Sequence, residues 1–201
     1  MFIVDESDSI GQANFGLVRD FLHSIVSSLD VSQTTVRVGI VTYNDNPTAQ
    51  AYLDTFNDKN DTRQFIKILP YTGGGTNTGK ALDFTRNEIF NEKKGSRKDV
   101  QKVAVVITDG ESQDDVSEAA VRLRRKGITV FAIGIKDASI SQLEQIASYP
   151  PNKHVFTVDS FTELKPMKTI LQKILCNNIN EQAVIDNKRT SDAKDGLSQF
   201  F

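Results

Sequence analysis

Short apolar runs alternate with amphipathic stretches along most of the chain. Runs that are apolar at nearly every position are typical of strands buried on both faces of a parallel sheet. The clearest example is Lys102–Thr108, with the sequence KVAVVIT. Strands are also predicted at Phe2–Val4, Val36–Tyr43, Ile128–Gly134 and His154–Val158, with a shorter one near Ala49–Leu53.

The stretches between these runs have the periodicity of helices that face a core. From Ile10 onward, apolar residues repeat at helical spacing: Val18, Phe21, Leu22, Ile25, Val26 and Leu29. Further helices are predicted at Lys59–Leu69, from the glycines at 73–75 to about Phe90, and at Val116–Lys126, Ile140–Ala147 and Phe161–Leu175. Because strands and helices alternate, we expect an α/β fold: a doubly wound, mostly parallel sheet with helices on both faces.

The polar C-terminal end and the abrupt N-terminal start bear on domain organisation. From Glu181 onward the helical periodicity fades, so we expect one domain over residues 1–178 and a polar linker or disordered tail over 179–201. The opening residues 1–5 are too short for a signal peptide and are typical of the end of a strand. The first strand is therefore expected to be truncated at a cut edge.

Charge and hydropathy exclude two classes of partner. The formal net charge is -2, and no basic stripe or polybasic tail appears in the sequence, so nucleic-acid binding is not expected. No apolar run approaches the roughly 20 residues that cross a bilayer, so membrane insertion is not expected.

Two local features are weakly informative about a secreted origin. Cys176, the one cysteine, is either a small buried hydrophobe or half of a disulfide in a secreted parent protein, and the sequence leaves both open. Asn60-Asp61-Thr62 is an N-glycosylation sequon and supports secretion only slightly.

Three polar segments lie where predicted strands end, at the edge where doubly wound sheets bind ligands. They are Asp5–Ser9 (DESDS), Gly73–Gly79 (GGGTNTG) and Thr108–Glu111 (TDGE). In the first segment, Asp5, Ser7 and Ser9 alternate, so a turning extended loop aims all three side chains at one point.

The candidate ligands in these segments are all oxygen donors: Asp5, Ser7, Ser9, Thr76 and Asp109. A set without sulfur or imidazole selects a hard cation, Mg²⁺ or Mn²⁺ in its place, over zinc or copper. With so few protein ligands, the coordination shell retains waters or accepts a ligand atom from outside.

The order and spacing of these residues resemble the metal-ion-dependent adhesion site of the von Willebrand factor A family. The stretches GGGTNTGKAL and VVITDGESQDDV are similar to extracellular-matrix members of that family, such as collagen VI alpha chains and matrilins. The resemblance covers about residues 1–176. It implies a Rossmann-like sheet with one short antiparallel edge strand, and a secreted, non-catalytic adhesion module of the extracellular matrix.

The resemblance also assigns roles to the residues. It implies that Ser7 and Ser9 ligate the metal directly and that Thr76 does so at least in the ligand-ready state. It also implies that Asp5 and Asp109 act mainly through coordinated water, and that an acidic residue of a partner completes the shell. Partners would be matrix proteins such as collagens, with self-association also open. Glu6 stands where relatives often have glycine, and its charge, with that of Asp8, is expected to make the rim more acidic.

Three other interpretations remain at this stage. Ser9 and Thr76 are also common helix caps, so both could serve only as turn residues. The domain could act as a metal-independent spacer or assembly module. Finally, Gly74–Lys80 spells G-x-x-x-x-G-K, as in nucleotide hydrolases, but Ala81 stands where that motif needs Ser or Thr, and neither histidine lies in a triad motif.

Overall fold

The computed structural model describes residues 1–178. It is divided into two units, of which the first spans Met1–Lys165 and the second begins at Pro166. The predicted strands and most of the predicted helices belong to the first unit. Residues 164–178 are helical, as predicted for the closing helix, whereas the expected linker or tail at 179–201 lies outside the described residues.

The first unit is built on a six-stranded sheet with the order β3-β2-β1-β4-β5-β6. Its strands are β1 (Phe2–Asp5), β2 (Ile40–Tyr43), β3 (Pro47–Ala51), β4 (Lys102–Thr108), β5 (Ile128–Ile135) and β6 (Val155–Val158). All neighbours pair in parallel except β2 and β3, which are antiparallel. This confirms the predicted sheet and its single antiparallel edge strand.

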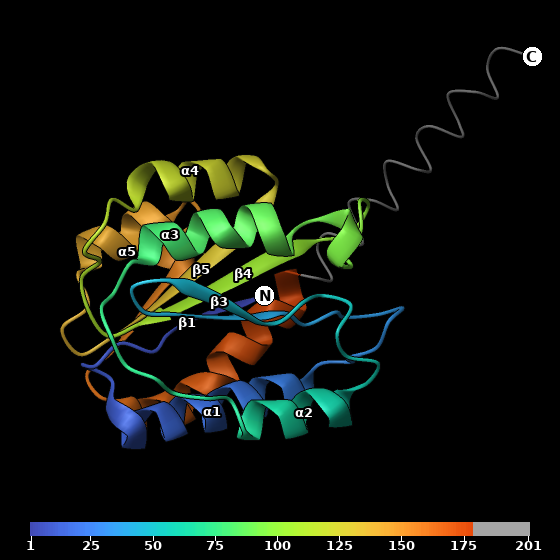
Figure 1. Ribbon diagram of the computed structural model, residues 1–201, viewed down its shortest axis with the longest axis horizontal. Coiled ribbons are helices and arrows are strands. Elements are labelled where there is room, and N and C mark those ends of the chain that lie inside the picture. Colours follow the sequence, from blue (N-terminus) through green and yellow to red (C-terminus); the bar gives the residue numbers. More distant parts are fainter. Residues whose placement is uncertain (179–201) are drawn as a thin grey trace, which may run out of the picture. The chain divides into compact units, whose positions relative to one another are not determined.

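Helices cover both faces of the sheet (Figure 1). On one face lie α1 (Gly11–Ser28) and α2 (Lys59–Lys67), and on the other lie α3 (Thr78–Phe84), α4 (Ser117–Arg125) and α5 (Ile140–Ile146). The short elements are the π-helical turn η1 (Thr85–Ile89), the 3-10 turns η2 (Glu92–Lys94) and η3 (Phe161–Glu163), and α6 (Pro151–His154). The doubly wound arrangement is therefore the one expected.

Several element boundaries differ from the prediction. The strand predicted from Val36 begins only at Ile40, because the Val36 amide closes a turn by donating to the Asp30 carbonyl oxygen at 3.0 Å. The helix predicted to run to Phe90 leaves α-helical geometry after Phe84 and continues as a π turn. His154 ends a short helix rather than starting a strand, and its Nδ1 lies 3.0 Å from the Pro150 carbonyl oxygen.

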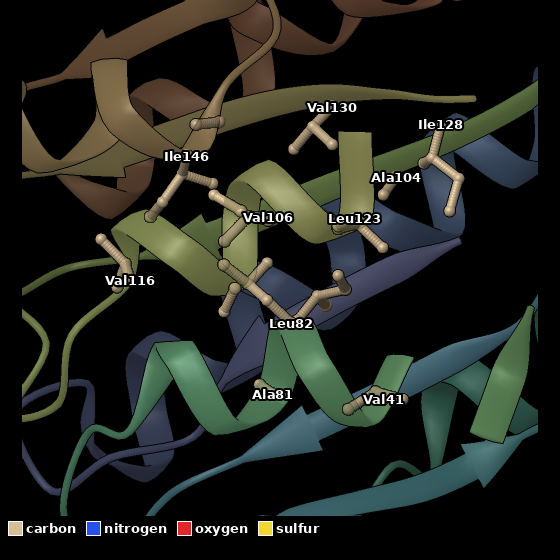
Figure 2. Packing of buried hydrophobic residues seen from close by; sticks show 14 of the residues in the cluster. Val41, Ala81, Leu82, Ala104, Val106, Val116, Leu123, Ile128, Val130 and Ile146 are labelled. Atoms are coloured by element: carbon tan, nitrogen blue, oxygen red, sulfur yellow. The ribbon is translucent and has the colours of Figure 1, made fainter. Parts of the chain in front are cut away.

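Apolar side chains between the sheet and the α3–α4–α5 layer form one core. Figure 2 shows Leu82 of α3 and Leu123 of α4 among side chains of the central strands, including Val106 and Val130. All four are fully buried. Burial of a side chain of this size contributes about 1.5–3 kcal/mol, so the core holds the strand ends, and the loops that follow them, in fixed positions.

The register between β1 and β4 determines which loops meet. Val4 pairs with Ile107, so Asp5 at the end of β1 lies beside Thr108 at the end of β4. The chain order of the sheet reverses between these two strands. Such a switch point is where doubly wound sheets bind ligands, and here both strands end in an aspartate-bearing loop.

Gly79, in the first turn of α3, is a position where a side chain does not fit. A Cβ there would meet the Asp115 carbonyl oxygen and would lie 2.9 Å from Asp114 Oδ1. We expect Gly79→Ala to lower the free energy of unfolding by about 1–3 kcal/mol, the usual cost of overpacking. Urea unfolding of the metal-free protein measures this.

The matched control is Gly16→Ala. Gly16 lies inside α1, and no neighbouring atom lies within 4 Å of the place that an added Cβ would occupy. Alanine there is expected to stabilise the protein by about 0.5–1 kcal/mol. Equal effects of the two substitutions would contradict the close approach of α3 to the 112–115 loop.

Candidate metal centre

Asp5 lies fully buried at the end of β1, and both of its carboxylate oxygens accept hydrogen bonds. Oδ1 accepts from the Ser7 amide at 2.8 Å, and Oδ2 accepts from the Thr108 hydroxyl at 2.7 Å. The first bond turns the chain sharply after the strand, and the second ties that turn to the end of β4. Asp5 thus fixes the loop that carries the two candidate serines.

The two serines connect this loop to the second carboxylate. Ser9 Oγ donates to Asp109 Oδ1 at 2.7 Å, and the Ser7 and Ser9 hydroxyl oxygens lie 3.0 Å apart. Ser7 and Asp109 are buried, whereas Ser9 is exposed. One network of oxygen atoms, open to solvent at Ser9, therefore contains Asp5, Ser7, Ser9 and Asp109.

The electrostatics of this network favour a cation. Burial raises the pKa of Asp5, and the nearby Asp109 carboxylate raises it further against the hydrogen bonds that lower it. Burial likewise raises the pKa of Asp109, partly offset by the bond from Ser9. Two carboxylates held out of water near each other cost free energy when ionised, and a divalent cation beside them would relieve that cost. The donor set therefore fits a hard cation.

Neither Ser9 nor Thr76 acts as a simple helix cap. The residue preceding α1 is Ile10, which provides no side-chain cap, and the Ser9 hydroxyl points to Asp109 instead. At the start of α3 the amides of Gly79 and Lys80 are capped by Asp114 of another loop, at 2.7 and 2.8 Å, so Thr76 is not the cap either.

Hydrogen bonds that involve the backbone hold the loop of Thr76 against the loops that follow β1 and β4. The Asp8 amide donates to the Gly74 carbonyl oxygen at 2.9 Å, and the Gly74 amide donates to Asp8 Oδ1 at 3.0 Å, which joins the glycine loop to the serine loop. From the other side, the Thr76 amide and carbonyl bond to Gln113, at 3.1 and 2.7 Å. These bonds tie the loop that carries Thr76 to the serine loop and to Gln113, whereas the network of side-chain bonds joins the other four residues.

The glycine loop cannot serve as a phosphate cradle. A P-loop binds phosphate through free backbone amides, but here successive amides already donate to side chains: Gly74 to Asp8, Gly75 to Asp45 at 3.2 Å, and Thr76 to Gln113. Two of these three acceptors are carboxylates, which would repel a phosphate. The geometry therefore argues against the nucleotide interpretation.

Glu6 does not extend the acidic rim as expected. Its side chain is buried, and Oε1 accepts from Asn44 Nδ2 and from the Thr72 hydroxyl, each at 3.1 Å. In the loop after β1 the Glu6 side chain lies against Asn44, which follows β2, and against Thr72, and no hydrogen bond joins it to Asp109. Its second oxygen, Oε2, is buried without a hydrogen-bond partner. Glu6 joins the serine loop to the loops after β2 and before α3.

Sequence reasoning missed the residues that support the site. Thr108 bonds Asp5, and Tyr71 accepts from the Gly11 amide at 3.2 Å and donates to the Ser7 carbonyl oxygen at 3.1 Å. A signal existed only for Thr108, which precedes Asp109. Nothing in the local pattern around Tyr71 connects it to the serine loop.

Other candidate features have simpler roles. Within residues 1–178, no three His, Cys, Asp or Glu side chains cluster as they would around a metal, so a cation here would depend on hydroxyl ligands. Cys176 is exposed, so the buried interpretation is wrong, and no disulfide is present in the described part. No described helix is long and apolar enough to cross a membrane.

Known proteins resemble the chain over nearly its full length. Residues 1–172 match the von Willebrand factor type A domain. The collagen alpha-4(VI) chain of Mus musculus is 40% identical over 194 residues, which cover 96% of this chain and 8% of that protein. Matrilin-1 of Bos taurus is 35% identical over 176 residues, 88% of this chain and 32% of that protein. The chain thus spans a small part of these relatives.

A solved structure shares the fold. Proximal thread matrix protein 1 of the mussel byssus, with a zinc-occupied MIDAS motif, superposes with a TM-score of 0.80 at 28% identity, over 87% of this chain and 47% of that one. The collagen and matrilin relatives are secreted matrix proteins, which agrees with the extracellular location predicted from the sequence. The chain belongs to the von Willebrand factor type A domain family, as an extracellular-matrix module.

Proposed function

We propose that residues 1–178 form an adhesion or matrix-assembly domain that binds protein partners through a divalent cation. The proposed ligands are Asp5, Ser7, Ser9, Thr76 and Asp109. The observation that carries this proposal is the hydrogen bond from Ser9 to Asp109, because a serine preceding a helix would otherwise cap it. Matrix proteins such as collagens are the proposed partners, and no catalytic role is assigned.

The residues divide into two kinds of ligand. Ser7, Ser9 and Thr76 offer hydroxyl oxygens and are proposed to hold the cation directly. Both oxygens of Asp5 already accept hydrogen bonds from the protein, which supports a role at one remove, through water, and Asp109 is proposed to act likewise. When bound, the cation would supply a positive centre for a carboxylate of the partner.

Oxygen donors alone favour Mg²⁺ or Mn²⁺. The zinc-occupied site of the mussel protein supports a divalent cation in general rather than either metal in particular.

A metal-independent assembly domain is the second candidate. It is favoured by the way the site residues satisfy one another: the Ser7 and Ser9 hydroxyls lie in hydrogen-bond contact, and Ser9 donates to Asp109. Partner binding that persists in EDTA would support this candidate over the first.

The substitution Asp109→Asn tests two effects of this carboxylate: destabilisation of the metal-free protein and stabilisation by bound Mg²⁺. Burial raises the pKa of Asp109, so the folded protein loses stability at neutral pH, where this carboxyl is ionised in the unfolded chain, and the amide is expected to raise the melting temperature of the metal-free protein. Saturating Mg²⁺, at 100 times its Kd, adds about 2.7 kcal/mol to the stability of the natural sequence, whereas the variant is expected to gain almost nothing. Thermal unfolding with EDTA or Mg²⁺ measures both effects.

The control is Asp137→Asn, which removes the same charge from an exposed aspartate near Asp109. It is expected to retain the Mg²⁺ stabilisation. An equal Mg²⁺ effect on Asp109→Asn and on the natural sequence would rule out Asp109 as part of the site.

Asp45→Ala tests whether the glycine loop positions Thr76. The exposed Asp45 carboxylate accepts from the Gly75 amide, and loss of one such bond, worth about 0.5–1.5 kcal/mol, is expected to weaken Mg²⁺ binding by about 2- to 12-fold. Calorimetric titration measures the Kd. Asp45→Asn keeps the acceptor and is expected to restore most of the affinity, whereas unchanged binding by Asp45→Ala would contradict the positioning role.

A further inference from the structure

The two ends of the parallel strands differ in their balance of exposed charge. The loops at the C-terminal ends, where the candidate metal centre lies, carry exposed carboxylates at Asp8, Asp45, Glu111, Asp115 and Asp137. The exposed basic side chains nearby are Lys80 and Lys136. This acidic rim would keep its negative sign with a divalent cation in place, so a partner that brings only a carboxylate would be repelled.

The opposite ends of the strands carry a basic surface, formed around the connector of residues 90–101 that leads into β4. The exposed Lys93 and Lys98 belong to this connector, and Lys102 follows it. Lys126, from the turn before β5, reaches it by donating to the carbonyl oxygens of Arg86 and Phe90, at 2.7 and 2.6 Å. Because these residues come from separate segments, the sequence shows no basic stripe.

Two arginines belong to the same surface. Arg97 donates to the Thr34 and Thr35 carbonyl oxygens, at 3.2 and 2.6 Å, and Arg37 donates to the Gly95 carbonyl oxygen at 2.8 Å. Burial, then repulsion from Arg37, lowers the pKa of the Arg97 guanidinium. Since their acceptors are neutral carbonyl groups, these cations keep their charge available to an outside partner.

Carboxylates are present within this basic surface, and they include the exposed Asp54, which lies against Gly95 of the connector. Glu92 pairs with Lys98 at 3.4 Å, and Asp83 pairs with Arg86 at 3.8 Å and with Arg122 at 2.7 Å. Asp99, by contrast, is exposed in a turn between Lys98 and Lys102 and forms no salt bridge within residues 1–178. An unpaired carboxylate flanked by lysines complements an acidic rim around a cation, because the carboxylate can reach the cation while the lysines face the acidic side chains.

We infer that the partner of the metal-bearing rim includes a second copy of this chain, which docks its 90–101 connector so that Asp99 completes the metal shell and Lys93 and Lys98 face the acidic rim. The inference rests on the proposed function, because it requires a cation at the site. The contact is heterologous: one end of each copy binds the opposite end of the next. Such contacts form rings or open chains rather than closed two-fold dimers.

Sedimentation velocity of the full chain tests this, with Mg²⁺ or EDTA and at low salt, because about 0.1 M salt already limits charge interactions to about 10 Å. The natural sequence is expected to form concentration-dependent oligomers with Mg²⁺ and to stay monomeric in EDTA. Asp99→Asn, and separately the pair Lys93→Glu and Lys98→Glu, are expected to weaken association at least about tenfold, or about 1.4 kcal/mol. The pair Lys59→Glu and Lys67→Glu on α2 makes the same charge change elsewhere and is expected to associate normally.

Mixing two defective variants gives the decisive result. Asp99→Asn lacks the docking carboxylate but has an intact rim, whereas Asp109→Asn has an altered rim and an intact connector. At a concentration near the dissociation constant of the natural sequence, each alone is expected to be mainly monomeric, and their mixture is expected to form one-to-one dimers with Mg²⁺. A monomeric mixture, or undiminished association of Asp99→Asn, would overturn the inference.

Calorimetry with Mg²⁺ alone separates this inference from the proposed function. Mg²⁺ binding by a chain that stays monomeric overturns the self-docking inference and leaves the metal site standing. Absence of Mg²⁺ binding overturns both.

Discussion

The candidate site depends on the parallel register between β1 and β4. Pairing of Val4 with Ile107 sets Asp5 beside Thr108, and the hydrogen bond between those two side chains fixes the turn that presents Ser7 and Ser9 to Asp109. A shift of one residue would send Asp5 to the other face of the sheet and separate the two carboxylates. The buried core on both faces of the sheet is what prevents such a shift.

The candidate site lowers the stability of the folded protein. Two buried carboxylates with raised pKa values oppose folding when both are ionised, and Glu6 adds a third buried acid with an unpartnered oxygen. The surrounding loops offset this with directed bonds, in which Asp8, Asp45 and Gln113 hold three successive amides of the glycine loop. Buried acidic groups that destabilise the fold at one place, and that hydrogen bonds from several loops hold in position, are typical of a functional site.

Most of the fold could be predicted from the sequence because apolar periodicity and strand ends are local properties. Because strand ends can be located from the local sequence, the sequence also predicted that the site residues lie at one edge of the sheet. Burial of Glu6, the bonds of Tyr71 to the serine loop and the gathering of Arg37, Arg97 and Lys126 around one connector depend on contacts between distant segments, and no local pattern encodes them. The late start of β2 at Ile40 likewise follows from a turn bond between Val36 and Asp30.

The most direct test is isothermal titration of the metal-stripped domain with Mg²⁺ and with Mn²⁺, beside the double variant Asp5→Ala, Ser7→Ala. We predict saturable binding of one ion per chain by the natural sequence, lost in the variant. Circular dichroism of the variant verifies that the fold persists. No binding by the natural sequence, or equal binding by a folded variant, would contradict the metal site and move the function to metal-independent assembly.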